Sequence, residues 1–340
     1  MKIAATGVTS SVGRRLCELA RERGHEVTGL VRDPSRLDAR SLERLGVRIV
    51  PGDLDNAAAL VEMARGADVF IHAAALVEDN ASRDEMLRVN VEGTRRAIEC
   101  VAKAGVSHVV NLSSTAVYGR PEKGRVTEAW PTRLPGTPYE DTKTLAERIA
   151  FERGKELGLS VIAVRPPIIY GPYDHNFMPR ALTMLKRRMA VLIDEGRAAL
   201  NVVWVDHVVD VVLAAALRPD LTGEAFNVMD TVDQRPPSVA EVFEAVARAA
   251  ELPPPRIRLS YAAAMALAKS LEIGFSVSRT KKKPPITPFV VKMLTRDVIY
   301  DSSKAARELG FTPRMDPLTG VTQFARLFSG KTSPHERSAS

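Results

Sequence analysis

Three residues of this 340-residue chain have the types and the spacing to move a proton at a hydroxyl group. Tyr139 and Lys143 stand four residues apart, and Ser114 precedes the tyrosine by 25 residues. A phenol with a pKa of about 10 is a weak base near neutral pH, but an ammonium group one helical turn away favours its ionised form. Ser114 offers a short hydroxyl that can orient a substrate oxygen and stabilise charge developing on it. Taken singly, Tyr139 could also be a packed aromatic residue at a helix start, and Ser114 a cap at a strand end.

The elements that must position this trio alternate between short apolar strands and helices. The expected strands are Lys2–Ala5, Glu26–Val31, Arg48–Val50, Val69–Ala73, His108–Leu112 and Ser160–Val164. The expected helices are Val12–Arg23, Arg36–Leu45, Ala57–Ala64, Arg83–Ala104 and Tyr139–Leu157. This alternation predicts an α/β fold of the Rossmann type, in which helices cover both faces of a doubly wound parallel sheet. Ser114 would then follow the fifth strand, and Tyr139 would begin the next helix.

The turn after the first strand has the form of a phosphate-binding loop. Gly7 allows the tight turn, and Gly13 lets the following helix pack closely on the sheet, with phosphate near the helix N-terminus. Ser10 stands where glycine normally lets the backbone approach the pyrophosphate. Its hydroxyl could bond a phosphate oxygen, but its Cβ needs space. We therefore expect a dinucleotide, held with modest affinity, to contact Gly7, Thr9, Ser10, Val12 and Gly13.

The end of the second strand decides between NAD(H) and NADP(H). An acidic residue there binds the ribose 2′-hydroxyl, whereas an arginine accommodates a 2′-phosphate. Val31 ends the strand in this chain, and Arg32 and Arg36 follow it. We expect these two arginines to favour NADP(H), while Asp33 leaves NAD(H) open.

Two further pairs of residues follow strands of the expected sheet. Asp53 and Leu54 come after the third strand and would lie near the adenine of the dinucleotide. Ala73 and Ala74 come after the fourth strand, where small residues leave room beneath a cofactor. Ordinary close packing explains the two alanines equally well.

Composition narrows the remaining classes of partner. The net charge is +7, and the segment between Arg256 and Arg296 alone carries +8, because its only acidic residue is Glu272. A DNA-binding interpretation needs a recognition motif, and none is visible, so we expect no nucleic-acid partner. Cys17 and Cys100 lie far apart in helical patterns, and no metal-ligand spacing occurs, so we expect buried thiols and no metal.

The proline pattern divides the chain into two parts. Residues 1–166 are expected to form the cofactor-binding domain, and a strand and helix over Asn201–Ala216, within 201–230, are expected to return to its sheet. Prolines from Pro166 onward break the remaining chain into short pieces, so 167–200 and 231–328 would form a smaller C-terminal substrate-binding lobe. Residues 331–340 are typical of a disordered tail. The first strand begins almost at Met1 and leaves no room for a signal peptide, so we expect a cytoplasmic protein.

Motifs over residues 2–328 resemble those of the extended short-chain dehydrogenases/reductases, the NAD-dependent epimerase/dehydratase superfamily. They are Thr6-Gly7-x-x-Ser10-x-x-Gly13, Asp53-Leu54, His72-Ala73-Ala74, Asn90-Val91-Glu92-Gly93-Thr94, Ser113-Ser114-Thr115-Ala116-Val117-Tyr118-Gly119, Tyr139-x-x-x-Lys143 and Arg165-Pro166-Pro167-Ile168-Ile169-Tyr170-Gly171-Pro172. The resemblance implies a nicotinamide enzyme whose catalytic residues are Ser114 (rather than Ser113), Tyr139 and Lys143. It also implies that Lys143 holds the ribose, that Pro166 and Ile169 contact the cofactor, and that Asn90 is mainly structural.

Within this superfamily, the run Pro284–Pro313 resembles the 3β-hydroxysteroid dehydrogenase and sterol-4-carboxylate dehydrogenase branch, and less specifically the dihydroflavonol-reductase branch. This implies a secondary alcohol or ketone on a steroid-like or other polycyclic substrate. The preceding segment, 261–283, is apolar at helical spacing and ends in basic residues, a pattern typical of peripheral contact with an anionic membrane. A helix packed on the substrate lobe, followed by an exposed basic loop, is the alternative. The apolar positions are Ala264, Leu267, Leu271 and Phe275.

Two other functions compete with a dehydrogenase or reductase. A nucleotide-sugar epimerase or dehydratase uses the same scaffold, and Asn176 lies where such enzymes often place an asparagine toward the sugar nucleotide. A cofactor-sensing protein without catalysis would normally have lost Tyr139 or Lys143, and both are present. The resemblance further implies a homodimer that pairs the helices Arg83–Ala104 and Tyr139–Leu157.

Overall fold

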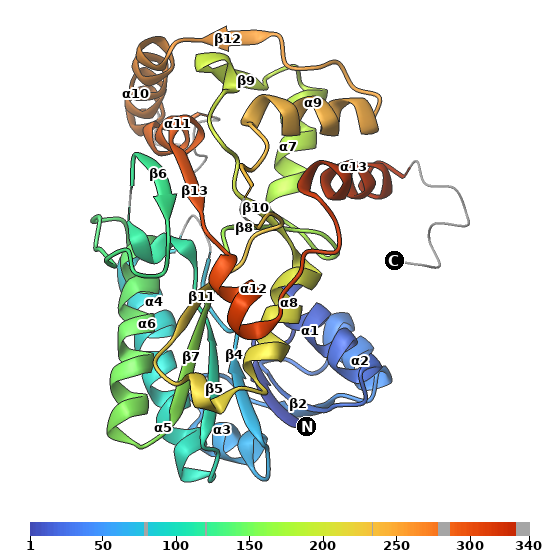
Figure 1. Cartoon of the computed structure of the whole chain (residues 1–340), viewed down its shortest axis with the longest axis vertical. Helices are drawn as coiled ribbons and strands as arrows, with labels where there is room; N and C mark the ends of the chain where they lie inside the picture. Colours follow the sequence, from blue (N-terminus) through green and yellow to red (C-terminus); the bar gives the residue numbers. More distant parts are fainter. Residues whose placement is uncertain (78–80, 120, 233, 278–285, 331–340) are drawn as a thin grey trace.

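Seven parallel strands form the central sheet, in the order β11-β7-β5-β4-β1-β2-β3 (Figure 1). The computed structural model describes residues 1–77, 81–119, 121–232, 234–277 and 286–330. The strands of this sheet are β1 (Lys2–Thr6), β2 (Glu26–Val31), β3 (Arg48–Pro51), β4 (Val69–His72), β5 (His108–Leu112), β7 (Ser160–Arg165) and β11 (Ala225–Asn227). The predicted Rossmann-type fold is confirmed, and its strand order reverses between β1 and β4, where such folds bind ligands.

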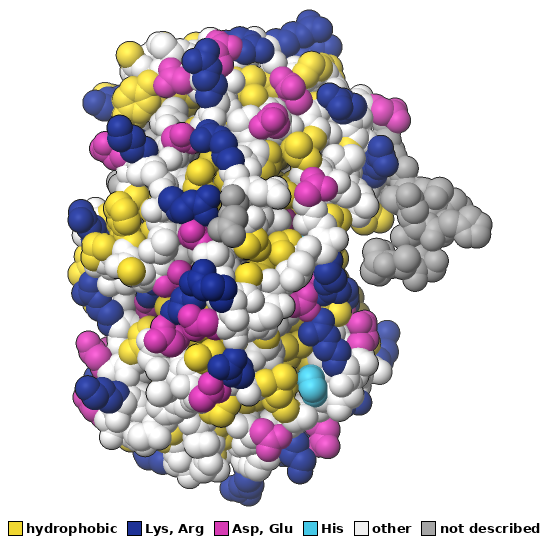
Figure 2. Space-filling view, viewed as in Figure 1, with side chains coloured by type: hydrophobic (Ala, Val, Ile, Leu, Met, Phe, Trp, Pro, Cys, Tyr) yellow, Lys and Arg dark blue, Asp and Glu magenta, His cyan; other side chains and the backbone are white. Residues whose placement is uncertain are grey.

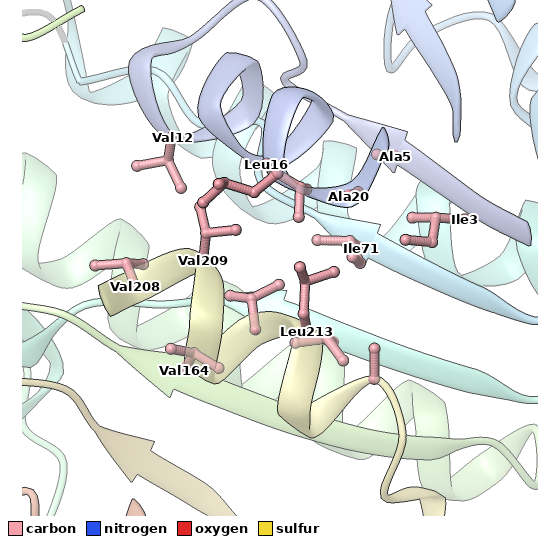
Figure 3. Packing of buried hydrophobic residues seen from close by; sticks show 14 of the residues in the cluster. Ile3, Ala5, Val12, Leu16, Ala20, Ile71, Val164, Val208, Val209 and Leu213 are labelled. Atoms are coloured by element: carbon pink, nitrogen blue, oxygen red, sulfur yellow. The ribbon is translucent and has the colours of Figure 1, made fainter. Parts of the chain in front are cut away.

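Helices cover both faces of this sheet. One face is covered by α1 (Ser11–Glu22), α2 (Leu37–Arg44) and α8 (Val205–Ala215). The other face is covered by α3 (Ala57–Ala64), α5 (Gly93–Lys103) and α6 (Pro138–Glu156). Figure 3 shows the first core, in which side chains such as Leu16 of α1, Val209 of α8 and Ile71 of β4 lie close together. Burial of such side chains, at about 1.5–3 kcal/mol each, fixes α1 and therefore the turn that precedes it.

Three small parallel sheets build the second lobe, and each joins segments that are distant in sequence. They pair β8 (Ile168–Tyr170) with β10 (Val202–Trp204), β9 (Val191–Ile193) with β12 (Ile257–Leu259), and β6 (Lys123–Val126) with β13 (Asp297–Tyr300). Helices α7 (Phe177–Lys186), α9 (Val239–Ala249), α10 (Tyr261–Val277), α11 (Pro288–Thr295) and α13 (Pro317–Phe328) complete it. Helix α12 (Ser303–Leu309) packs instead on α8 and β11, beside the large sheet. Short 3-10 turns lie at Thr115–Tyr118, Asp194–Gly196 and Pro219–Leu221.

Two predicted elements differ from the structure. The strand expected at the start of Asn201–Ala216 does not join the large sheet, because β10 pairs with β8, and the seventh strand is β11 instead. The single helix expected over Arg83–Ala104 is divided into α4 (Arg83–Met86), a π-helical turn and α5. The π-turn, Leu87–Glu92, is a local widening of the kind found near functional sites, and it contains Asn90.

The surface and the chain end bear on the remaining predictions. Figure 2 shows basic and acidic side chains interspersed over the visible face. Within the described ranges, no helix is both long and apolar enough to cross a bilayer. The tail expected at residues 331–340 and the basic residues Arg279, Lys281, Lys282 and Lys283 lie outside those ranges.

Candidate active site

Ser114, Tyr139 and Lys143 come together at the carboxyl end of β5. Ser114 caps the 3-10 turn after this strand, since its Oγ accepts a hydrogen bond of 3.2 Å from the Ala116 backbone N–H. Its side chain is also hydrogen-bonded to Tyr139, which begins α6. One helical turn later, Lys143 Nζ donates to the Leu112 carbonyl over 2.8 Å. The structure therefore places the three predicted residues around one point at the sheet edge.

The surroundings shift the pKa values of the phenol and the ammonium group. Burial raises the pKa of the Tyr139 phenol above its ordinary value, and the hydrogen bond with Ser114 opposes this shift. Burial lowers the pKa of Lys143 to about 8, and the charge of Glu147, one turn further along α6, opposes that shift. The arrangement thus offers a protonated phenol and a lysine whose charge depends on pH in the neutral to alkaline range.

A chain of buried hydrogen bonds runs beneath this site. The Thr94 hydroxyl donates to the Asn90 carbonyl over 2.6 Å, so its oxygen accepts a hydrogen bond from the N–H of His72 Nε2 at 2.9 Å. The other ring nitrogen, Nδ1, then accepts from Thr6 at 2.8 Å. Burial lowers the pKa of His72 to about 3, and the charge of Lys143 adds to this effect, so the imidazole is neutral. This chain ties the ends of β1 and β4 to α5.

Thr6 was not predicted as a site residue, although the pattern of strands contains the signal. Thr6 and His72 are the last residues of two strands that pair in parallel, with these residues in register. Polar side chains at adjacent strand ends of a parallel sheet lie close to one another. The Thr6 hydroxyl oxygen also accepts a long hydrogen bond, 3.4 Å, from the Ala74 backbone N–H, and so supports the segment after β4.

Asn90 fixes the segment after β4 to α6. Its Oδ1 accepts from the Leu76 N–H over 2.7 Å, and its Nδ2 donates to the Leu76 carbonyl over 3.1 Å. The same Nδ2 lies 3.2 Å from Thr142 Oγ1, and Thr142 in turn donates to the Tyr139 carbonyl. Asn90 is buried, and these contacts agree with the structural role that the resemblance implied.

The turn between β1 and α1 leaves no room for side chains at its two glycines. A Cβ on Gly13 would lie 2.1 Å from the Gly7 carbonyl oxygen, and one on Gly7 would lie 2.7 Å from the Ala73 backbone. Gly7 also has a φ of 71°, in the region that favours glycine. Ser10 is the helix N-cap, and its Oγ accepts from the Gly13 N–H over 3.1 Å. Ser10 thus occupies an N–H group that a glycine would leave open to phosphate.

At the end of β2, the Asp33 carboxylate is hydrogen-bonded within its own turn, whereas Arg32 is exposed to solvent. Asp33 accepts two hydrogen bonds from Ser35, 3.0 Å from its N–H and 2.6 Å from its hydroxyl. Arg36 forms an ion pair with Asp38 at 3.3 Å. Arg32 is exposed and makes no ion pair within the described part of the chain. The charge most available to a ligand at this strand end is therefore positive.

The remaining predicted contacts have varied surroundings. Asp53 and Thr9 are exposed, whereas Leu54, Ala73, Ala74 and Ile169 are half-buried and Pro166 is buried. Val12 is buried in the core beneath α1, so its side chain packs on the sheet and only its backbone faces the turn. Pro166 is held close to the trio, because its carbonyl accepts from the Thr115 N–H at 3.0 Å.

A buried ion pair that sequence reasoning did not identify anchors α6 to the sheet. Arg165 of β7 binds Glu147 of α6 through two hydrogen bonds, of 2.8 and 2.5 Å. Its third contact, 2.9 Å, is to the hydroxyl of Tyr118, which donates to Asn227 over 2.6 Å. The sequence did contain a signal for this ion pair. Arg165 and Tyr118 belong to two of the family motifs, and Glu147 follows Lys143 by one helical turn.

These features fit a nicotinamide dinucleotide along the carboxyl edge of the sheet. The glycine turn is closed to side chains but lies at a helix N-terminus, where backbone N–H groups bind phosphate. The hydroxyl of Ser113 is buried and has no hydrogen-bond partner among the described residues. This hydroxyl is a buried polar group to which a bound dinucleotide could hydrogen-bond.

Comparisons with known proteins agree with this arrangement. The model of the NAD dependent epimerase/dehydratase family matches residues 3–228. A ketoreductase of Stigmatella aurantiaca, which acts on 4-hydroxy-2-methyl-3-oxo-4-farnesyl-3,4-dihydroquinoline-1-oxide, is 28% identical over 94% of this chain and 95% of its own. Sterol demethylase protein B of Methylococcus capsulatus is 30% identical over 92% and 94%. The 3 beta-hydroxysteroid dehydrogenase/Delta 5-->4-isomerase of Mycobacterium tuberculosis is 27% identical over 95% and 89%.

Among solved structures, MoeE5 in complex with UDP-glucose and NAD resembles this chain over the full length of both proteins. Its TM-score is 0.74 and its sequence identity is 25%. The similarity therefore extends through the second lobe as well as the sheet.

Proposed function

This chain belongs to the NAD dependent epimerase/dehydratase family, and we propose that it is an oxidoreductase that interconverts a secondary alcohol and a ketone on a hydrophobic, polycyclic substrate. The observation that supports this most directly is the hydrogen bond between Ser114 and Tyr139, with Lys143 one turn further along α6. A bound nicotinamide supplies or accepts the hydride in such a reaction. The chain itself must then supply the proton and position the oxygen.

Each member of the trio has one task in this proposal. Ser114 orients the substrate oxygen, and Tyr139 gives it a proton in reduction or removes the proton in oxidation. The raised pKa of Tyr139 keeps the phenol protonated near neutral pH, which suits donation to a ketone. Lys143 holds the ribose through its donors, and its charge favours the phenolate when the reaction runs toward oxidation.

The substrate class is proposed from the names of the relatives. Three relatives are named for oxygen-bearing compounds with apolar ring systems. They are a ketoreductase of a farnesylated quinoline, a sterol demethylase protein and a 3 beta-hydroxysteroid dehydrogenase. The test is nicotinamide absorbance during incubation with a 3β-hydroxysteroid, with NADP⁺ and NAD⁺ in parallel. We expect turnover that Tyr139→Phe abolishes. No turnover with either cofactor, in protein that binds both, would refute the steroid assignment and direct the search to aryl ketones.

We propose NADP(H) as the preferred cofactor. Asp33 is occupied by Ser35, and Arg32 is exposed beside it, so a 2′-phosphate would meet a free guanidinium. Arg32→Ala is expected to weaken NADPH binding about tenfold, an energy close to that of a charged hydrogen bond, and to leave NADH binding unchanged. Arg48→Ala removes another exposed arginine, paired with Glu62, and is the matched control. Tighter binding of NADH than of NADPH by the wild-type protein would end this proposal.

A second function has an observation in its favour. MoeE5 binds UDP-glucose together with NAD and shares the whole fold. Asn176, the residue noted for nucleotide-sugar enzymes, is exposed on the loop before α7. Protein that purifies with tightly bound NAD and converts a UDP-sugar without net oxidation would establish this function instead.

We propose peripheral membrane contact through α10. Its inner side, Ala264 and Ala268, is fully buried, while Leu267 and Ile273 on the outer side are 43% and 66% exposed. Of the expected apolar stripe, Ala264 is buried and Leu271 and Phe275 are half-buried, while Leu267 is exposed, so most of that stripe packs on the lobe and Ile273 lies on the opposite side. Hydrophobic side chains are visible at this end of the molecule, at the upper left of Figure 2. Sedimentation with vesicles containing phosphatidylserine should decrease for Ile273→Asp, and equal sedimentation would refute the contact.

A homodimer through α5 and α6 is proposed from the family resemblance alone. Their outward side chains include the ion pair between Arg153 and Glu99, at 2.7 Å. Light scattering is expected to give twice the 37.1 kDa chain mass. A mass equal to one chain would reject the dimer.

A further inference from the structure

The loop between β8 and α7 is attached to the helix that follows the phosphate-binding turn. The Tyr173 hydroxyl donates to Glu18 Oε1 of α1 over 2.6 Å. The guanidinium of Arg14, also on α1, lies 4.1 Å from the centre of the Tyr173 ring. A cation over an aromatic face is attracted by the ring electrons, so two contacts hold this one side chain.

The next residue in the loop is attached to the other lobe. Asp174 is buried, and its carboxylate accepts hydrogen bonds from the N–H groups of Asn176, Phe177 and Met178, at 2.7, 2.9 and 2.8 Å. These groups form the first turn of α7. Two adjacent residues therefore connect α1 on the large sheet with α7 in the lobe.

The backbone at Tyr173 shows that this position is held by its contacts. Its φ is 67°, in the left-handed region that residues other than glycine seldom adopt. A bulky residue stays in that region only where surrounding contacts determine it. The contacts to Glu18 and Arg14 on one side, and those of Asp174 on the other, supply that constraint.

The anchor on α1 is itself fixed. Glu18 also accepts from Arg15 NH1 over 2.9 Å, and Arg15 binds both carboxylate oxygens of Asp206, at 2.6 and 3.0 Å. Asp206 lies in the first turn of α8. Tyr173 therefore binds a carboxylate that is held between two packed helices, and a rigid partner makes the contact more effective.

We propose that Tyr173 fastens this loop beside the dinucleotide and slows release of the cofactor. The loop leaves β8 shortly after Ile169, an expected cofactor contact, and reaches α1 just beyond Gly13, where the phosphates bind. A cofactor held between these points leaves only when the loop separates from α1. Tyr173 is thus a positioning residue, and this role rests on the dinucleotide binding proposed above.

The test is the dissociation rate of NADPH and of NADH. Protein loaded with the reduced cofactor is mixed rapidly with an excess of the oxidised cofactor, and the change in nicotinamide fluorescence is followed. Tyr173→Phe should release either cofactor about fivefold faster, the factor equivalent to one ordinary hydrogen bond, with an unchanged association rate. Glu18→Gln keeps an acceptor but loses its charge, so it should give a smaller increase. Arg23→Gln is the matched control, because it breaks another ion pair from α1, to Asp210 of α8, away from the loop.

Hydrogen exchange without cofactor separates this proposal from the proposed function. In Tyr173→Phe, the amides of Asn176, Phe177 and Met178 should exchange faster than in the wild-type protein, and in Arg23→Gln they should not. A protein that binds neither dinucleotide but shows this change would refute the proposed function and keep the fastened loop. Unchanged release and exchange in Tyr173→Phe and Glu18→Gln, or an equal change in Arg23→Gln, would overturn the role of Tyr173.

Discussion

The central sheet and the second lobe of this molecule are built from different kinds of contact. In the sheet, β1 to β4 lie beside strands from the first 112 residues only, and each is joined to the next through a single helix. In the lobe, each two-stranded sheet joins segments from distant parts of the chain, as in the pairing of β6 with β13. The proposed catalytic trio lies at the edge of the sheet and on α6, whereas the loop before α7 is attached to the lobe as well as to α1. The positions of the three proposed catalytic residues therefore depend on the first half of the chain, while the lobe is assembled from distant segments.

Each region also has its own buried polar centre. In the sheet, Arg165 is bound by Glu147 and the Tyr118 hydroxyl. Where the lobe meets α8, the Asp230 carboxylate accepts from Tyr170, at 2.8 Å, and from His207 Nδ1 and the Trp204 N–H, each at 2.7 Å. The first centre connects two elements of the sheet half, and the second connects the lobe to it. Substitutions at the two centres should therefore have different effects.

Arg165→Leu should have the largest effect. It leaves Glu147 buried without its partner, which costs about 3–5 kcal/mol of the free energy of unfolding. Urea unfolding followed by circular dichroism measures this change. Arg48→Gln breaks an exposed ion pair with Glu62 and should cost at most about 1 kcal/mol. Equal losses in the two variants would contradict the role given to burial.

Asp230→Asn should have the next largest effect, confined to the junction of the lobe. The amide keeps one acceptor oxygen but places an NH₂ group against a donor, at a cost of about 1–3 kcal/mol. Hydrogen exchange should increase in α7, α9 and α13 before it increases in β1 or β4. Loss of protection in both regions together would show that the lobe and the sheet unfold as one unit.

The pH dependence of Lys143 should give two opposite trends. Its charge is lost as the pH rises through about 8, so cofactor affinity should fall about tenfold between pH 7 and 9. The unfolded lysine keeps its proton to about pH 10.4, so the contribution of this group to the free energy of unfolding rises between about pH 8 and about pH 10.4. Titration calorimetry at several pH values measures the cofactor affinity, and thermal unfolding at the same pH values measures the stability. In Lys143→Gln the step in affinity should disappear, and a step that persists would assign it to another group.

Substitution of Ser10 should have the smallest effect. It tests the position at which the turn between β1 and α1 has serine where glycine is usual. Ser10→Gly removes both the Cβ and the cap on the Gly13 N–H, at a cost of a few tenths of a kcal/mol in stability. Cofactor affinity should rise about threefold, because the N–H becomes available to phosphate. Ser10→Ala frees the same N–H but keeps the Cβ, so an unchanged affinity in this variant alone would identify the Cβ as the obstacle.

The sequence predicted the sheet well and the lobe poorly, for physical reasons. The strands Glu26–Val31 and His108–Leu112 and the helix Ala57–Ala64 have the predicted bounds, since apolar periodicity and turn residues define them locally. The trio could be placed because a strand end and a helix start fix Ser114 and Tyr139. The pairing of β10 with β8 was missed, because three-residue strands give no periodic signal and their partners are set by tertiary packing.

The hydrogen bonds of Asp33 and Tyr173 could not be predicted from the sequence either. The residue types indicated what Asp33 could bind, but only the structure shows that Ser35 already engages it. Tyr173 and Glu18 are separated by 155 residues, and nothing in their spacing connects them. Local patterns identify candidates, and long-range contacts determine which of them are available.

The pairing of β6 with β13 has a consequence for the nascent chain during its synthesis. The strand Lys123–Val126 leaves the exit tunnel about 170 residues before Asp297–Tyr300, and at ordinary elongation rates this delay is roughly ten to thirty seconds. During that interval the sheet half can fold, while an unpaired strand edge stays open beside Tyr118. The nascent chain is then exposed to wrong strand partners, and chaperone dependence in the cell should be greatest shortly before synthesis ends.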